Sequence, residues 1–164
     1  MMPALKLEQG AIEVKPMVSK KKKKAKGKSK IGILTCSNTT KVLDCPVSVC
    51  LKDMYDRKGA FARYGGQEIE LVGIISCNGC PTISGEDIVL PKVEALLHYG
   101  ADRIHLTYCM MVLCPFVKKY IKVIKAKFPS LDLVEGTHEP HQTDNQFRCG
   151  VVAMLKERRK TIIP

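Results

Sequence analysis

Four short apolar runs, separated by longer segments with helical patterning, constrain the fold of this 164-residue chain more than any other feature. Each run has the length of a strand and is rich in Ile, Val or Leu, which is typical of parallel strands that are covered on both faces. The runs are residues 30–35, 69–76, 103–108 and 131–137. We predict that each of them forms a buried strand.

The segments between and after these runs are expected to be helical. The predicted helices are residues 45–62, 86–101, 115–128 and 142–160. Gly100 and Pro129 mark the ends of the second and third helices, and Pro91 places the start of the second helix near itself. The last helix carries Cys149.

Strands that alternate with helices require crossover connections, which are right-handed in a parallel sheet. We therefore predict an α/β fold: a three-layer, mostly parallel, four-stranded sheet of the flavodoxin-like type, with strand order 2-1-3-4. The predicted organisation is a disordered Lys-rich tail at 1–29, an α/β domain at 30–141, and a C-terminal helix and tail at 142–164.

The net charge of +11 is concentrated at the N-terminus. Residues 1–30 contain ten Lys and two Glu, which leaves a charge of only +3 for residues 31–164. A lysine block of this kind is typical of a solvated, disordered tail. Any nucleic acid that it bound would be held non-specifically and in a salt-sensitive way.

No stretch of the chain approaches the roughly 18 apolar residues that span a bilayer, and the N-terminus lacks the apolar core of a secretory signal. We therefore expect no membrane partner and a cytoplasmic location. Thiols stay reduced in the cytoplasm, so the eight Cys of this chain indicate ligands or redox groups rather than structural disulfides.

Cysteines stand where the predicted strands end. Cys36, Cys77 and Cys109 follow the first three strands, and His138 stands at the same place after the fourth. The carboxyl ends of parallel strands lie along one edge of a sheet, with neighbours about 4.8 Å apart, so these side chains are expected to converge. The pattern predicts a soft-metal or iron–sulfur site at this edge of the sheet.

The connecting loops add further thiols at the same edge. Cys80 completes a C-x-x-C motif with Cys77, and Cys114 lies five residues after the cysteine of the third strand. Cys45 and Cys50 flank the start of the first predicted helix. The helix starts beyond Cys80 and Cys114 are expected to favour thiolate over thiol.

Other cysteines and histidines have plainer interpretations. We interpret Cys149 as a buried small apolar residue, His105 as a hydrogen-bonded core residue, and His98 as a surface residue at a helix end. Whether Cys45, His105 and His141 contribute ligands is left open by the sequence.

Several strings of the sequence are similar, in order and spacing, to those of the CGGC-domain family. They are KIGILTC, CPVSVCLKD, KGAF, VGIISCNGCP, IHLTYC and EGTH. The resemblance covers residues 30–138 and implies a metal-binding, in particular zinc-binding, protein. The family's motif residues fall on Cys36, Cys50, Cys77, Cys80, Cys109 and His138. Asn78 replaces the first glycine of the central motif, and the stretch after Cys109 is shorter than in the family.

We predict a cysteine-rich metal-binding protein that holds zinc or an iron–sulfur cluster, and the sequence leaves the choice between them open. The predicted ligands are Cys36, Cys50, Cys77, Cys80, Cys109, Cys114 and His138. A role as an accessory or carrier subunit of a redox system, with a protein partner in a larger complex, agrees with this prediction.

Two alternatives remain open at this point. A thiol-disulfide oxidoreductase would use Cys77 and Cys80, and a nucleic-acid-associated protein would use the Lys-rich tail. No serine–histidine–acid arrangement, phosphate-binding glycine loop or nucleotide fingerprint stands out in the sequence. The sequence therefore predicts no catalytic residue and leaves enzymatic activity undecided.

Overall fold

The structure is a computed structural model that describes residues 28–80 and 85–162. Except for Lys28 and Ser29, the predicted Lys-rich tail lies outside the described residues. In chain order the elements are β1 (Ser29–Thr35), the π-helix η1 (Asn38–Val42), α1 (Ser48–Asp56), the 3-10 helix η2 (Gly59–Tyr64), β2 (Ile69–Ser76), α2 (Gly85–His98), β3 (Arg103–Leu106), α3 (Tyr108–Leu113), α4 (Val117–Lys127), β4 (Asp132–Glu135) and α5 (Asp144–Ile162).

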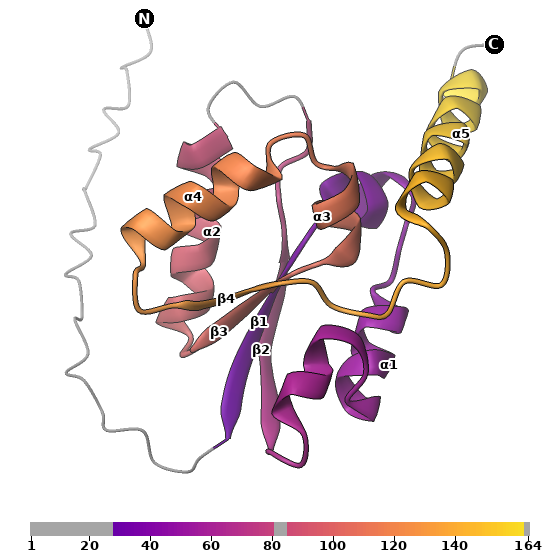
Figure 1. Ribbon diagram of the computed structural model, residues 1–164. Coiled ribbons are helices and arrows are strands. Elements are labelled where there is room, and N and C mark those ends of the chain that lie inside the picture. Colours follow the sequence, from indigo (N-terminus) through magenta and orange to yellow (C-terminus); the bar gives the residue numbers. More distant parts are fainter. Residues whose placement is uncertain (1–27, 81–84, 163–164) are drawn as a thin grey trace, which may run out of the picture.

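The four strands form one parallel sheet with the order β2-β1-β3-β4. Helices α2 and α4 cover one face of the sheet, and α1 and η2 cover the other (Figure 1). The predicted α/β class, the three layers and the strand order are therefore confirmed. All carboxyl ends of the strands lie at one edge, followed in sequence by the cysteine-rich segments.

Side chains of β1 alternate between two apolar cores. Ile31 and Ile33 pack with Met54 of α1 and Phe61 of η2, whereas Leu34 packs with residues of α2, α3 and α4. This alternation follows from the two-residue period of a strand. A central strand that is buried on both faces explains why its sequence is a continuous apolar run.

Two glycines let α2 lie close to the sheet. Gly32 of β1 and Gly73 of β2 are direct neighbours across the sheet. A Cβ atom at Gly32 would lie 2.9 Å from a methyl carbon of Leu96, and one at Gly73 would lie 3.3 Å from the other methyl carbon. Larger residues at these positions would require the Leu96 side chain to shift.

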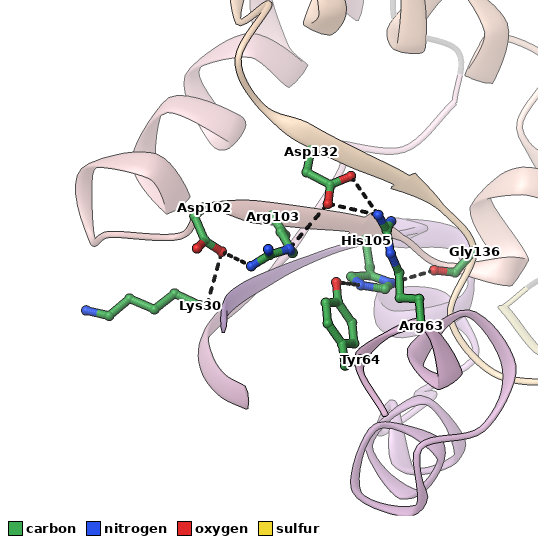
Figure 2. A network of polar contacts seen from close by, with 8 residues as sticks. All are labelled: Lys30, Arg63, Tyr64, Asp102, Arg103, His105, Asp132 and Gly136. Carbon is green, nitrogen blue, oxygen red and sulfur yellow. Dashed lines mark hydrogen bonds and ion pairs between the residues drawn. The ribbon is translucent and has the colours of Figure 1, made fainter. Parts of the chain in front are cut away.

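The buried His105 of β3 fixes η2 to the sheet (Figure 2). Its Nε2 lies 2.7 Å from the hydroxyl of Tyr64, and its Nδ1 lies 2.8 Å from the carbonyl oxygen of Gly136. The ring of Phe61 stacks on it, with 4.3 Å between the ring centroids. Burial lowers the pKa of His105 to about 4, so the ring is neutral at pH 7. The interpretation of His105 as a hydrogen-bonded core residue is confirmed.

Ion pairs gather at the opposite, amino end of the strands (Figure 2). Asp132, the first residue of β4, pairs with Arg63 of η2 at 3.0 Å and with Arg103 of β3 at 3.3 Å. Asp102 accepts hydrogen bonds from Arg103 and from the backbone N–H of Lys30. These groups are partly exposed, so each pair contributes roughly 0–1 kcal/mol to stability. These ion pairs thus lie away from the edge that carries the thiols.

The single helix predicted for residues 45–62 is wrong. The structure has two short helices there, α1 and η2, because Arg57 and Gly59 have positive φ angles of 59° and 53°. Such angles end a right-handed helix. Both helices are too short for their boundary to show in the apolar pattern.

The predicted start of α2 near Pro91 is also wrong, because α2 begins at Gly85 and contains Pro91. A proline inside a helix removes one backbone hydrogen bond and costs about 3 kcal/mol. The burial of Val89, Val93 and Leu96 in the core on both sides of the proline offsets this cost.

The boundaries predicted for the third strand and the third helix differ from those in the structure. β3 ends at Leu106 rather than at residue 108, since Tyr108 begins the six-residue helix α3. The helix predicted for residues 115–128 corresponds to α4, which begins at Val117. Helix α3 was missed because six residues give no measurable periodicity.

None of the helices in the described part of the chain has the length and apolar character needed to cross a membrane.

Candidate metal-binding edge

The carboxyl edge of the sheet carries the thiols that follow the strands. Cys36 and Cys77 come directly after β1 and β2, and Cys109 is the second residue of α3, three positions beyond the end of β3. His138 lies three residues after β4. The strand order places β1 between β2 and β3, so the thiol of Cys36 stands between the other two along the edge.

Cys36 and Cys77 form a buried, hydrogen-bonded pair of thiols. The two side chains are 3% and 7% exposed. The hydrogen bond from Cys36 lowers the pKa of Cys77 to about 5, and the backbone N–H of Ser37 adds a second donor at 3.3 Å from Cys77 Sγ. The same hydrogen bond, together with burial, raises the pKa of Cys36. One proton is therefore shared by the pair, and the negative charge is held on Cys77.

Cys109 lies between two threonine hydroxyl groups. Its Sγ is 3.2 Å from Thr39 Oγ1 and 3.1 Å from Thr107 Oγ1. It lies close enough to Cys36 and Cys50 to raise the pKa of each of these thiols electrostatically. Cys109 is thus close to Cys36, at the end of β1, and also to Cys50 on α1.

Cys50, on the first turn of α1, faces the loop after β4. Its Sγ lies 3.2 Å from His138 Nδ1 and 3.4 Å from Thr137 Oγ1. Burial raises the pKa of Cys50 to about 11 and lowers the pKa of His138, so both groups are neutral at pH 7. Histidine binds a metal as the neutral imidazole, so His138 is in the form that a metal ligand requires.

A third contact between two predicted ligands joins Cys80 and Cys114. A hydrogen bond joins the two side chains, and Cys114 also interacts electrostatically with Cys77. Burial raises the pKa of Cys114 to about 11. The expectation that a following helix favours the thiolate of Cys114 is therefore wrong, because burial outweighs the hydrogen bond from the backbone N–H of Phe116.

The loop that carries His138 is held by α1 and η2. The carboxylate of Asp53 on α1 accepts a hydrogen bond of 2.9 Å from the N–H of Glu139, and the N–H of Ala60 donates to the carbonyl oxygen of Thr137 at 2.8 Å. A Cβ atom on Gly59 would lie 2.5 Å from that same carbonyl oxygen. The close approach at Gly59 thus allows the loop to sit against the thiol of α1.

A cavity of about 460 Å³ opens beside this edge. Cys50, Cys109 and His138 line it, and so do Cys45 and His141, which are exposed. One wall comes from the segment before and at the start of α1, and the other comes from α5. Three of the predicted ligands and two of the undecided residues therefore face the same space.

The ring of Tyr108 joins the cavity to α5. It lies 5.2 Å from the ring of His138 and 5.2 Å from that of Phe147, measured between centroids. Its hydroxyl donates a hydrogen bond of 2.7 Å to Asp144 at the start of α5. Helix α5 is thereby held against the edge that carries the thiols.

Cys149 does not belong to this edge or to the core. Its side chain is exposed on α5, with Asn145 as its neighbour at 3.9 Å. The interpretation of Cys149 as a buried apolar residue is wrong, because the outer face of α5 is solvated. His98 is exposed at the end of α2, as predicted.

The polar residues that support the thiols were not predicted from the sequence. Thr39, Thr107 and Thr137 are buried and lie within hydrogen-bonding distance of Cys109 or Cys50. Asp53 is a buried carboxylate on the apolar side of α1. The strings TCSNTT, LTYC and GTH carry the signal, since each places a threonine within three residues of a predicted ligand.

The donor set has the chemistry of a soft-metal site. Thiols and neutral imidazole select zinc or iron–sulfur clusters over magnesium or calcium. The contacts join the donors in pairs, and within residues 28–80 and 85–162 no three His, Cys, Asp or Glu side chains form a group that could hold a metal ion. The residues therefore fit a metal by their chemistry, and its binding would have to draw the pairs together.

Comparison with known proteins gives three results. The family model of the CGGC domain matches residues 30–138. A protein of Methanocaldococcus jannaschii, described as uncharacterized, is 30% identical over 118 residues, which cover 66% of this chain and 86% of that protein. No solved structure matches the chain.

Proposed function

This chain belongs to the CGGC-domain family, as its sequence indicated, and from that premise we propose that its carboxyl-edge thiols bind a soft metal, as zinc or as an iron–sulfur cluster. The proposed ligands are Cys36, Cys50, Cys77, Cys80, Cys109, Cys114 and His138. The proposed domain organisation keeps them all within residues 30–141, followed by the C-terminal helix.

One observation carries the proposal: separate strands and loops bring these side chains into contact in pairs. The partner of Cys77 is Cys36, 41 positions away in sequence, and the partner of Cys50 is His138, 88 positions away. Thiols that served only as small apolar residues would not need to contact another thiol or a histidine.

The protonation of these groups suits metal binding. The lowered pKa of Cys77 favours its thiolate at pH 7, whereas Cys50 and Cys114 have raised pKa values and would release protons when a metal binds. Six thiols and one imidazole exceed the four ligands of a single zinc. The proposal therefore includes a cluster or two metals.

The test is metal analysis of the full-length protein after purification without oxygen, combined with a visible absorption spectrum. Wild-type protein should hold metal in a fixed molar ratio; zinc leaves it colourless, whereas a cluster is coloured. Cys77→Ser should lose most of the metal. Cys149→Ser is the matched control, because that thiol is exposed and lies outside the site, and it should keep the wild-type ratio.

Full metal content in Cys77→Ser would contradict the proposal, provided that circular dichroism shows the variant to be folded. An equal loss in Cys149→Ser would also contradict it, since the metal would then depend on thiols in general.

Thiol-disulfide exchange is the second candidate, and the lowered pKa of Cys77 favours it. The hydrogen-bonded partner of Cys77 is Cys36 rather than the Cys80 of its C-x-x-C motif. Rapid reduction of insulin disulfides by metal-free protein would support this activity. Loss of the activity in Cys36→Ser but not in Cys80→Ser would identify Cys36 as the second thiol.

A carrier or accessory role in a redox system is the setting that we propose for such a site. A reducing compartment such as the cytoplasm would keep the thiols available to a metal. Co-purification of a metal-dependent partner enzyme from cell extract, lost in Cys77→Ser and kept in Cys149→Ser, would support that role.

A further inference from the structure

The cavity beside the metal-binding edge has apolar walls. Val47 and Val49, at the start of α1, form part of one wall, and Val151 and Met154 of α5 form part of the other. The cavity volume of about 460 Å³ lies within the range of roughly 300–1,000 Å³ that is typical of small-molecule sites. A ligand with a mainly apolar body would fit these walls.

No charged side chain lines this cavity among the described residues. The chain has 27 Lys and Arg and 16 Asp and Glu, so charge is abundant elsewhere. Nucleotides, phosphate esters and carboxylates are normally held by such charges. The lining therefore favours an uncharged ligand.

Soft donors line part of the cavity. Cys50, Cys109 and His138 line it, whereas the other four proposed ligands do not. Zinc that drew these three ligands together would keep one coordination position for a further ligand. Because only these three proposed ligands face the cavity, a molecule bound there would meet this group, and a sulfur atom is the donor that such a metal would prefer.

We propose that this cavity binds a small, uncharged and mainly apolar thiol, with its sulfur at Cys50, Cys109 and His138. The choice of a thiol rests on the proposed metal-binding function, whereas the apolar and uncharged body follows from the lining of the cavity alone.

The probe for this site is benzyl mercaptan, which has an aromatic body and one thiol. Its binding to the full-length, metal-containing protein is measured by calorimetry without oxygen. Benzyl alcohol replaces the thiol by a hydroxyl, and 4-(mercaptomethyl)benzoate adds a negative charge to the apolar end. We expect saturable binding of benzyl mercaptan, and weaker binding of both analogues.

Two residues of α5 offer a matched pair of variants. Met154 is 47% exposed and lines the cavity, whereas Val152 is 43% exposed and does not. Met154→Glu should weaken binding of benzyl mercaptan roughly tenfold, because a carboxylate then borders the apolar space. Val152→Glu should leave it unchanged. Val49→Glu, on the opposite wall, should act like Met154→Glu.

Equal effects of Met154→Glu and Val152→Glu, or tighter binding of the charged analogue than of benzyl mercaptan, would overturn the inference. The same samples are analysed for metal, so the two proposals can fail separately. Absence of metal would refute the proposed function. If metal is present and benzyl mercaptan binds no better than benzyl alcohol, the choice of a thiol is wrong, although the proposed function stands.

Discussion

At the residue scale, burial and hydrogen bonds, more than nearby charged side chains, determine the pKa values of the thiols at this edge and of His105 in the core. The pKa of Cys77 falls because Cys36 and a backbone N–H donate to its sulfur, whereas the pKa values of Cys50 and Cys114 rise because each is buried. His105 is buried without a charged partner in contact and is held by one hydroxyl and one carbonyl group. These environments set which groups lose a proton and which resist gaining one.

His105 should make stability depend on pH. In the folded protein its pKa is lowered to about 4 by burial, whereas in the unfolded chain it returns to the ordinary 6.5. Between these values the unfolded state binds the extra proton, so stability is lost as the pH falls. From pH 7 to pH 5 this residue should reduce the free energy of unfolding by about 2 kcal/mol.

Urea unfolding at pH 7 and pH 5 measures this loss. His105→Gln should remove about 2 kcal/mol of the difference between the two pH values, whatever its effect on stability at pH 7. His98→Gln is the control, because that side chain is exposed, and it should keep the wild-type difference. An unchanged difference in His105→Gln would show that the imidazole titrates normally in the folded state.

At the scale of elements, the loop after β4 depends on the turn between α1 and η2. Gly59 has a φ of 53°, and a Cβ atom there would meet the carbonyl oxygen of Thr137 at 2.5 Å. That loop carries His138, which contacts Cys50 on α1. The turn therefore couples the stability of the fold to the position of a proposed ligand.

Gly59→Ala should lower the free energy of unfolding by roughly 2–3 kcal/mol and should also reduce metal content, because the new methyl group displaces Thr137 and His138. Gly65→Ala is a matched control, since Gly65 has a φ of 51° and no atom within 4 Å of the added carbon. Because Gly65 has a ψ of −127°, Gly65→Ala should also lose roughly 1–3 kcal/mol through backbone strain, but it should leave metal content unchanged. Equal losses of metal in the two variants would mean that only backbone strain matters at Gly59.

The strands and their order could be predicted because each strand is an apolar run and because crossovers in a parallel sheet are right-handed. Cys36 and Cys77 could be placed at one edge for the same reason. The boundaries of α1, η2 and α3 could not, since positive φ at Arg57 and a six-residue helix leave no periodic signal. The pairing of Cys77 with Cys36 rather than with Cys80 depends on how loops fold back over the edge, which spacing along the chain does not determine.

At the scale of the whole molecule, the ion pairs of Asp132 and the thiols occupy opposite ends of the sheet. Arg63, Arg103 and Asp132 pair at the amino end, and the sulfur atoms lie at the carboxyl end. A metal bound at the carboxyl end would link segments from β1 to the loop after β4. Its removal should therefore affect the entire fold.

Removal of the metal with a chelator should lower the melting temperature of wild-type protein, because a ligand that binds only the folded state stabilises it. The expected shift is at least several degrees, and readdition of the metal should reverse it. A melting temperature that does not change with metal content would show that the metal is not held by the folded edge.

The most direct test of the shared site is a crystal structure of the metal-containing protein, grown without oxygen and measured at the absorption edge of the metal. We predict anomalous density at the carboxyl edge, bonded to sulfur atoms from at least two different strand ends, with Cys36 or Cys77 among them. Metal located elsewhere, or bonded to Cys77 and Cys80 alone, would contradict this prediction.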